Sequence, residues 1–392
     1  DPGPGVQSLM ATNQKDLFVL KMTCGGNFVW VKKIGGLYNE VGQSIAFTLS
    51  GNILIAGYFE GNLDLDPGIG VSAVISNGME DAFLLELDSG GNFIRQENWG
   101  GNLTDIAFEV VCSSGGDIYT SGIFSDTTDM DPSIGTNFCI SNGTTDIFIM
   151  KQDSFLNLKW VKCFGGSGDD RINALKLFAD TTIYCAGTFL DTADFNPNAG
   201  TYLLGSAGLE DVFLSSFDST GDFNWARRVG GNDMDWGYSM TIDMVGNSYV
   251  AGTFRNTADF NQGLGLDTIN SMGSDDGFVC KHDQAGNFKW AKSISGPQPQ
   301  NATTLMCDSL CNLYLGGSFY WSADFDPSVN TYFFSANGNL NADAYLTKWD
   351  STGSLSWIFT FGNTLFDGIY RLCVSDSGYI YSAGYYGLTV DF

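Results

Sequence analysis

The residues best placed to do chemistry are pairs of acidic or amide side chains that stand two positions apart. Asp64 and Asp66 precede Pro67 and Gly68, and similar pairs recur every 65 residues. Oxygen ligands on alternate residues, before a turn that frees backbone carbonyls, suit Ca²⁺. The same carboxylates could instead accept hydrogen bonds from their own loop and fix an Asx-type turn. The predicted metal ligands are Asp64 and Asp66, Asp129 and Asp131, Asp194 and Asn196, Asp259 and Asn261, Asp324 and Asp326, and Asp391 with Asp1 in a copy divided between the termini. Ligand charge sets affinity, so the pairs with two carboxylates are expected to bind Ca²⁺ best.

Two further acidic series follow the same repeat. One is expected in loops at a channel mouth, either as a solvated rim or around a central cation; it comprises Glu40, Asp105, Asp170, Asp235 and Asp367, with Gln300 in the remaining copy. The other begins a strand in every period, and its regular use indicates a role in the fold; it comprises Asp16, Asp81, Asp146, Asp211, Asp276 and Asp343.

The elements that carry these residues are β-hairpins. Residues 81–88 and 93–95 alternate with period two around a Gly-Asn turn, and residues 44–47 and 53–57 form a second hairpin signature. Two hairpins per period give a four-stranded antiparallel unit. Six periods predict an all-β, six-bladed β-propeller with almost no helix, because radial stacking buries both faces of each sheet. The alternative is a β-helix or a linear array. The N- and C-terminal hairpins are expected to share one blade and close the ring, making residues 1–392 one domain.

Composition limits the partners. The formal net charge is −26, which disfavours nucleic acid and anionic membranes. No apolar run reaches the roughly 18 residues that a transmembrane helix needs, so no direct membrane insertion is expected. The opening Asp1-Pro2-Gly3 is typical of a piece excised from a longer polypeptide. Among the cysteines, Cys163, Cys185 and Cys280 are predicted to be buried free thiols, whereas pairing of Cys307 with Cys311 is left open.

Aromatic and irregular positions add candidate contact sites. Trp30, Trp160, Trp225, Trp290 and Trp357 are expected to wedge between blades, the alternative being a sugar-stacking ring. His282 is predicted to be a partly exposed surface residue. The strongest departures from the repeat are Pro297–Gln300, Phe319–Trp321 and residues 338–341, which could form a partner-binding patch or reflect drift.

The repeat resembles the bacterial SBBP-type β-propeller repeats of secreted and surface proteins. The likeness rests on residues 211–213, 221–225, 246–249 and 258–261 and extends over the whole chain. It implies a scaffold without common chemistry, located outside the cell or on its surface. The family label implies seven blades, whereas this sequence counts six.

These observations predict a non-enzymatic extracellular or cell-surface module that presents propeller loops to a protein or glycan, stabilised by Ca²⁺ and part of a larger multidomain protein. No other cofactor is expected. One alternative is a polysaccharide hydrolase or lyase that uses carboxylates at the channel mouth, since paired carboxylates are abundant. Another is a plain spacer. A single histidine and the absence of a Gly-Lys-Ser/Thr loop disfavour histidine triads and phosphate-loop chemistry.

Overall fold

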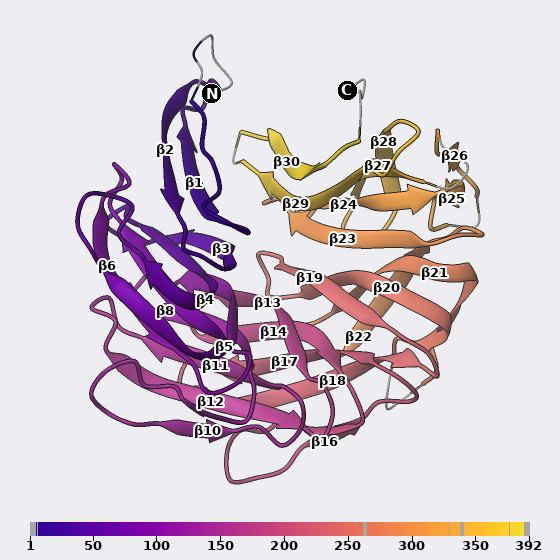
Figure 1. The fold of residues 1–392 in the computed structure, drawn as a ribbon. Helices are drawn as coiled ribbons and strands as arrows, with labels where there is room; N and C mark the ends of the chain where they lie inside the picture. The colour runs from indigo at the N-terminus through magenta and orange to yellow at the C-terminus, as the bar shows by residue number, and fades with distance from the viewer. Residues whose placement is uncertain are drawn as a thin grey trace. The chain divides into compact units, whose positions relative to one another are not determined.

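The computed structural model describes residue 5 and residues 7–261, 265–328, 330–337, 341–375 and 377–387. Every regular element in these ranges is a β-strand, which confirms the prediction of an all-β chain (Figure 1). No helix that could cross a membrane therefore occurs in the described ranges. The chain divides into two compact units, residues 1–180 and 181–392. Each is described by itself, and the single-domain organisation stays a prediction.

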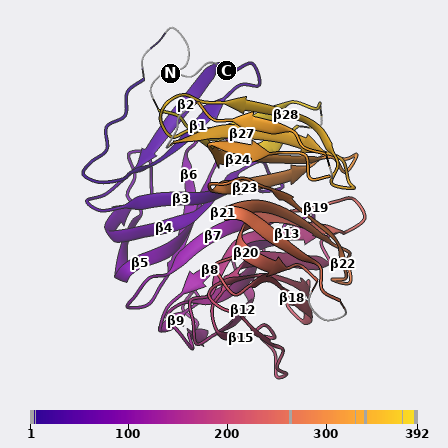
Figure 2. The ribbon, with the colours of Figure 1, turned by 90° about the vertical axis from the view of Figure 1, so that its right-hand side faces the viewer.

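The first unit contains antiparallel sheets built from consecutive hairpins. One four-stranded sheet has the order β3-β4-β5-β6, and β7, β8, β11 and β12 pair in that order as part of a larger sheet; Figure 2 shows β3, β4 and β5 side by side. The strands are β1 (Leu17–Met22), β2 (Phe28–Ile34), β3 (Glu40–Phe47), β4 (Ile53–Asp64), β5 (Ala73–Leu87), β6 (Phe93–Trp99), β7 (Ile106–Cys112), β8 (Ile118–Phe124), β9 (Thr127–Asp129), β10 (Phe138–Ile140), β11 (Asp146–Gln152), β12 (Leu158–Gly166) and β13 (Arg171–Phe178).

The second unit repeats this organisation. Its four-stranded sets are β19-β20-β21-β22 and β23-β24-β27-β28, and β14, β17 and β18 pair in that order. The strands are β14 (Thr182–Phe189), β15 (Thr192–Asp194), β16 (Leu203–Gly205), β17 (Asp211–Asp218), β18 (Phe223–Gly231), β19 (Trp236–Ile242), β20 (Ser248–Asp259), β21 (Thr268–His282), β22 (Phe288–Ile294), β23 (Gln300–Cys307), β24 (Leu313–Tyr320), β25 (Ser322–Asp324), β26 (Phe333–Ser335), β27 (Ala342–Trp349), β28 (Leu355–Phe361), β29 (Gly368–Val374) and β30 (Ile380–Tyr385).

Neighbouring sheets pack face to face within each unit. In the first unit Leu54 and Leu84 of one sheet share a core with Val110 and Phe148 of the next. All seven residues of β8 are buried, because a central strand is covered on both faces. Each fully buried aliphatic or aromatic side chain contributes about 1.5–3 kcal/mol relative to exposure. This stacking of four-stranded sheets is the packing expected of a β-propeller.

One glycine position shows how closely the strands pack. Gly122 in β8 lies where a Cβ atom would overlap the Ile106 carbonyl and the Phe148 ring. The register of β7 with β8 shifts between Ala107 and Glu109 beside it, and the first strand of the other hairpins of this type shifts at the matching place. Such a bulge strengthens the local twist of a strand.

The terminal hairpins differ from their internal counterparts in exposure. β1 pairs with β2, and β29 pairs with β30, each as a two-stranded sheet. In β1, Phe18 and Leu20 are 62% and 43% exposed, whereas the matching Phe83 and Leu85 in β5 are fully buried. Exposed apolar side chains at these positions lack the neighbouring strand that covers them elsewhere. The count of six blades and the closure of the ring stay predictions.

Ring closure predicts a specific cross-strand pair. In the internal sheets Ile55 of β4 opposes Leu85 of β5, and a ring closed with the same register would pair Ser382 with Leu20. A chain carrying Leu20→Cys and Ser382→Cys should therefore form a new intramolecular disulfide under mild oxidation, detectable by peptide mapping. Leu20→Cys with Tyr381→Cys is the matched control, because adjacent strand residues point to opposite faces. Equal cross-linking of both pairs, or of neither, would contradict closure by these strands.

Candidate functional site

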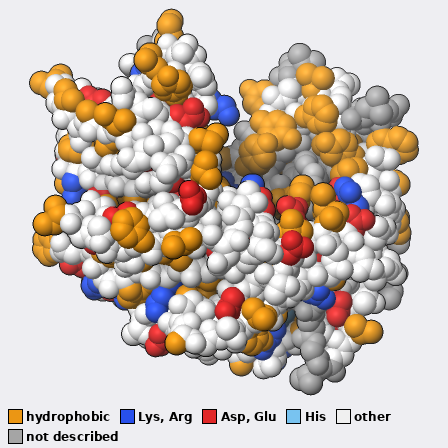
Figure 3. Space-filling model, turned by 60° about the horizontal axis from the view of Figure 1, so that its bottom comes forward, with side chains coloured by type: hydrophobic (Ala, Val, Ile, Leu, Met, Phe, Trp, Pro, Cys, Tyr) orange, Lys and Arg blue, Asp and Glu red, His pale blue; other side chains and the backbone are white. Residues whose placement is uncertain are grey.

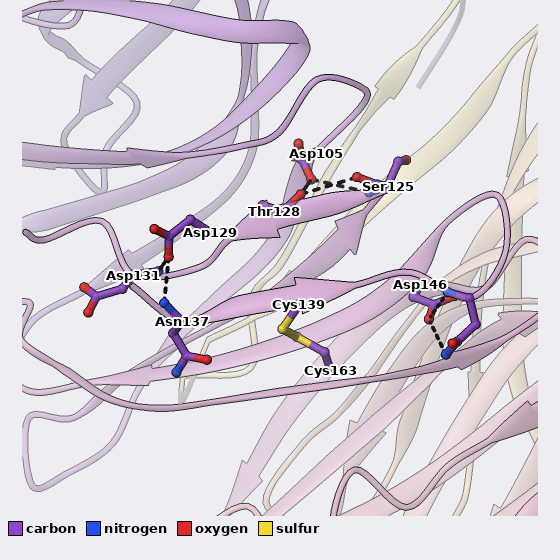
Figure 4. Close-up of a disulfide and its surroundings, with 10 residues drawn as sticks. Asp105, Ser125, Thr128, Asp129, Asp131, Asn137, Cys139, Asp146 and Cys163 are labelled. Carbon is purple, nitrogen blue, oxygen red and sulfur yellow. Dashed lines mark hydrogen bonds between the residues drawn. A yellow bond between two sulfur atoms is a disulfide. The ribbon is translucent and has the colours of Figure 1, made fainter. Parts of the chain in front are cut away.

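The first residue of each Asp-x-Asp/Asn pair holds its own loop closed. Asp64 Oδ1 accepts hydrogen bonds from the N–H of Asp66 at 3.1 Å and of Ser72 at 2.7 Å. The N–H of Leu65 donates to the Ser72 carbonyl at 3.1 Å. Asp129 makes the equivalent bonds, one of them to Asn137 (Figure 4). The same two acceptor contacts recur at Asp194, Asp259 and Asp324.

The second residue of the pair folds back on the same loop. Asp66 Oδ1 accepts the Gly68 N–H at 2.7 Å, and a Cβ on Gly70 would clash with the other carboxylate oxygen. Asp131, Asn196 and Asp326 accept the N–H two residues ahead in the same way. The Asx-turn interpretation is therefore confirmed for these loops. No group of three or more His, Cys, Asp and Glu side chains in the described ranges is arranged to hold a metal. Asp391 and Asp1 lie outside those ranges.

The acidic series predicted for a channel mouth is buried. Glu40 is 1% exposed, and Asp105, Asp170, Asp235 and Asp367 are fully buried, as is Gln300. The prediction of a solvated rim is therefore wrong for these side chains. Each of the five acids accepts the N–H of the residue four positions before it, at 2.6–2.9 Å. Asp105 also accepts bonds from Thr128 and Ser125 (Figure 4), which ties its loop to the neighbouring strand.

A second buried acid stands 24 residues before each member of this series. Asp211 and Asp235 both lie against Gly230, and Asp146 and Asp170 both lie against Gly165, where a Cβ would clash with either carboxyl group. The earlier acids also accept the N–H of a preceding loop residue, at 2.9–3.1 Å. In these two pairs, both acids therefore hold their loops beside the same glycine. The pairs are Asp16 with Glu40, Asp81 with Asp105, Asp146 with Asp170, Asp211 with Asp235, and Asp343 with Asp367; Asp276 is paired with Gln300.

One oxygen of most earlier acids has no hydrogen-bond partner in the described part of the chain. This holds for Oδ1 of Asp81, Asp146 and Asp211. Burial raises the pKa of Asp81 to about 7, and the nearby Asp105 adds to the rise; burial raises the pKa of Asp105 itself to about 6. Burial likewise raises the pKa of Asp211 and Asp235 to about 7. A proton held by the pair supplies the missing donor and removes the repulsion between the two carboxylates.

Stability should consequently rise as the pH falls from 8 to about 5. The folded chain keeps protons on these acids that the unfolded chain releases near pH 4, so their contribution is present at low pH and lost as pH rises through about 6–7. Melting curves across this range should show an increase of at least a few degrees. Asp105→Asn should reduce the increase, as Gln300 shows that an amide fits this position. Asp326→Asn, the same change in a loop acid, should not. A melting temperature that falls between pH 8 and 5 would contradict this account.

The tryptophans pack against the next period along the chain. Trp225 Nε1 donates to the Gln284 carbonyl at 3.1 Å, and its ring fills the space beside Gly286. Trp30 meets Gly91 and Trp290 meets Gly353 in the same way. The wedge interpretation is confirmed for these three residues, whose rings are held between adjacent hairpins.

Two predictions about single residues are wrong. Cys163 is not a free thiol: it forms a disulfide with Cys139, joining β12 to β10 (Figure 4). His282 is 2% exposed and therefore buried, because its ring packs edge-on against Phe288. Cys185 and Cys280 are buried free thiols as predicted, and Cys307 and Cys311 are unpaired.

Two of the departures, Pro297–Gln300 and Phe319–Trp321, lie side by side, because the Tyr320 N–H donates to the Pro299 carbonyl at 3.2 Å. Phe319 is fully buried, Trp321 is 48% exposed, and Gln300 is buried. Residues 338–340 lie outside the described ranges. The sequence did, however, contain a signal that its analysis missed. Arg227 and Arg228, two of only six arginines, are adjacent and line a cavity in the second unit together with His282.

Comparison with known proteins supports the repeat assignment. The family described as SBBP, a β-propeller repeat, matches residues 224–253. The chain contains an SBBP-type β-propeller repeat. This confirms the SBBP-type resemblance for residues 224–253, which lie in β18, β19 and the start of β20.

Curated relatives cover more of the chain. An uncharacterized WD repeat-containing protein of Acanthamoeba polyphaga mimivirus is 23% identical over 91% of this chain and 30% of its own length. The regulatory protein FlaEY of Caulobacter vibrioides is 30% identical over 43% of this chain and 18% of its own length. This chain thus matches less than a third of either relative. Among solved structures, Sqt1 from Chaetomium thermophilum is 12% identical over 85% of this chain and 74% of its own, with a TM-score of 0.34.

Proposed function

We propose that this chain is a non-catalytic scaffold that binds another protein through the loops that follow its Asp-x-Asp/Asn pairs. The observation that carries the proposal is the complete exposure of Ile69 and Ile134 on loops fixed by Asp64 and Asp129. Burying such a side chain against a partner contributes about 1.5–3 kcal/mol. A loop already fixed by internal hydrogen bonds loses little conformational entropy on binding.

Exposed apolar side chains also occur in the corresponding loops of several periods. Val71, Phe138, Leu203, Leu266 and Phe333 follow successive Asp-x-Asp/Asn pairs and are 54–83% exposed. On the face shown in Figure 3, apolar side chains lie among single acidic and basic ones. Apolar side chains with a polar surround favour a protein partner.

The comparisons support the same class of function. SBBP and WD repeats both build propellers, and a propeller offers loops from many strands as a contact surface. Both curated relatives are much longer than this chain, which supports the proposal that the scaffold belongs to a larger protein.

An extracellular or cell-surface location is part of the proposal. The Cys139–Cys163 disulfide supports an oxidising compartment. The acidic pairs argue against the hydrolase or lyase alternative, because wholly buried carboxylates bonded to their own loops cannot contact a polymer. A plain spacer binds no partner and would have no need of apolar side chains exposed on its loops. A glycan partner is a separate proposal.

The interface can be tested by charge insertion. Ile69→Asp with Ile134→Asp should abolish recovery of a specific protein partner from the native source and leave melting unchanged, because both side chains are fully exposed. Phe155→Asp is the matched control: Phe155 is 77% exposed but lies in the β11–β12 turn. Quantitative affinity capture should show a protein retained by the control and lost with the double variant. Identical profiles for all three chains would remove the case for these loops.

Stabilisation of the same loops by Ca²⁺ is also proposed. Asp129 and Asp131 supply two carboxylates in one turn, and a carboxylate has about four acceptor sites, more than the loop N–H groups use. Adding EGTA should then lower the melting temperature, and Ca²⁺ should restore it. Asp131→Asn should weaken the response, whereas Asn196→Ala, in a loop with one carboxylate, should change it less. If EGTA does not change the melting temperature, the proposal of Ca²⁺ binding is wrong, and the loops are stabilised by their hydrogen bonds alone.

A further inference from the structure

A cavity of about 790 Å³ lies in the second unit, between hairpins of successive periods. Its walls come from β16, β18 and the turn between β21 and β22, together with Asp259 and Asn261. The lining combines cations, aromatic rings and amide or carboxylate acceptors. The residues that matter for recognition are Tyr202, Arg227, His282, Asn287, Phe288 and Asp259.

Arg227 is a cation without a carboxylate partner in the described part of the chain. Its Nε donates to the Gly286 carbonyl at 2.8 Å, and its Nη1 donates to the Ala226 carbonyl at 2.7 Å. Longer contacts run from Nη1 to the Tyr202 hydroxyl and from Nη2 to the Ala285 carbonyl. These bonds and the Trp225 ring, whose centroid lies 5.5 Å from Cζ, fix the guanidinium; the bonds use four of its five N–H donors, and no carboxylate in the described part of the chain neutralises its charge. In a chain with a net charge of −26, a positioned and uncompensated arginine is unusual.

Arg228 beside it is compensated differently. Its Nε lies 3.2 Å from Asp211 Oδ2, and its Nη1 donates to the Gly205 carbonyl at 2.9 Å. Arg228 therefore interacts with Asp211 of the buried Asp211–Asp235 pair. Of the two arginines, only Arg227 is left to form an ion pair with a ligand.

His282 supplies an independent observation that points to a ligand. It is 2% exposed, lines the cavity, and its Nδ1 has no hydrogen-bond partner in the described part of the chain. A buried polar atom without a partner is costly, so the site favours a molecule that can bond to it. Burial and, to a smaller extent, the charge of Arg227 together lower the pKa of His282 to about 4, so the ring is neutral at pH 7. A neutral ring nitrogen can pair with a hydroxyl group.

We propose that this cavity binds an acidic saccharide, with a hexuronate residue as the recognised unit. The carboxylate would pair with Arg227, and a hydroxyl would pair with His282 Nδ1. The faces of Tyr202 and Phe288 would pack against the sugar ring. Asn287, whose amide nitrogen donates to Asp283 Oδ2 at 3.0 Å, keeps its carbonyl oxygen for another hydroxyl. The ligand would bind in addition to any protein held by the exposed loops.

The lining favours a sugar over an acidic peptide. Asp259 would repel a second carboxylate, whereas it can accept a hydrogen bond from a sugar hydroxyl. A cavity of this volume with a few directed polar groups and two aromatic rings has the character of a small-molecule site. A hexuronate has one carboxylate and several hydroxyl groups. The cavity offers one cation, Arg227, for the carboxylate and several hydrogen-bond acceptors for the hydroxyl groups.

Titration with galacturonate, which carries a single carboxylate, followed by calorimetry and by saturation-transfer NMR, tests the proposal on the full chain. Galacturonate should bind, and its methyl ester should bind at least tenfold more weakly because the ester lacks the charge that pairs with Arg227. Arg227→Gln should weaken binding about ten- to a hundredfold. His282 stays neutral between pH 6 and 8, so its protonation should not change the affinity in that range.

The controls separate this site from general charge effects and from the scaffold function. Arg171→Gln makes the same change in net charge in the first unit, at an exposed arginine paired with Asp169, and should leave binding unchanged. Tyr202→Ala, at a residue 36% exposed, should weaken binding even if Arg227→Gln disturbs folding. No saturation transfer to galacturonate, equal binding of its ester, or equal binding of tetraglutamate would overturn the proposal. None of these results depends on whether Ile69 and Ile134 bind a protein.

Discussion

The hydrogen bond from a loop N–H to a buried carboxylate is the interaction on which the rest of this structure depends. A loop that leaves a strand with unpaired N–H groups would be costly to bury, and an acid placed four residues later supplies the acceptor, as Asp105 does for Gly101. A second acid 24 residues earlier performs the same task for the adjoining loop. Where the two acids meet, as Asp211 and Asp235 do at Gly230, no side chain larger than hydrogen fits between them. Burial raises the pKa of both acids, and the nearby charge of Asp211 contributes to the rise at Asp235, so the paired loops are held most tightly when the pair holds a proton.

The hydrogen bonds from loop N–H groups to these paired buried acids explain why the sheets can stack so closely. Since the loop polar groups are satisfied internally, β4 and β8 can be buried on both faces, and Trp225 can fill the space beside Gly286 in the next period. Electrostatic fastening and apolar packing therefore act on the same hairpins. The Asp64 type of loop uses the same bond at the surface, where it holds Ile69 exposed while Leu65 is fully buried.

The sequence revealed the regular part of the molecule because periodicity reports the backbone. Spacing of 65 residues and alternation along strands predicted the hairpins, the strand that begins at Asp146, and the wedge position of Trp30. What periodicity cannot report is burial. The sequence around Asp105 is equally compatible with a solvent-exposed carboxylate at a channel mouth and with a buried carboxylate that accepts loop N–H groups. Only the residues that pack around Asp105 in the folded chain distinguish these two arrangements. The Cys139–Cys163 pair was missed for a related reason: β10 and β12 belong to different sheets, and only the folded chain brings the two sulfurs together.

Residues that recur in every period stabilise the fold, whereas residues that depart from the repeat can recognise a ligand. An acid that closes a loop in every period is committed to the fold, because its oxygens are bonded to backbone and its burial keeps ligands away. Specific recognition needs groups that the repeat does not use, and Arg227 is such a group: its neighbour Arg228 is held by Asp211, whereas Arg227 is positioned by carbonyls that leave its charge free. A scaffold of near-identical units can therefore acquire a distinct site by substituting a few residues beside one of its buried acid pairs, while the hydrogen bonds to that pair keep the site rigid.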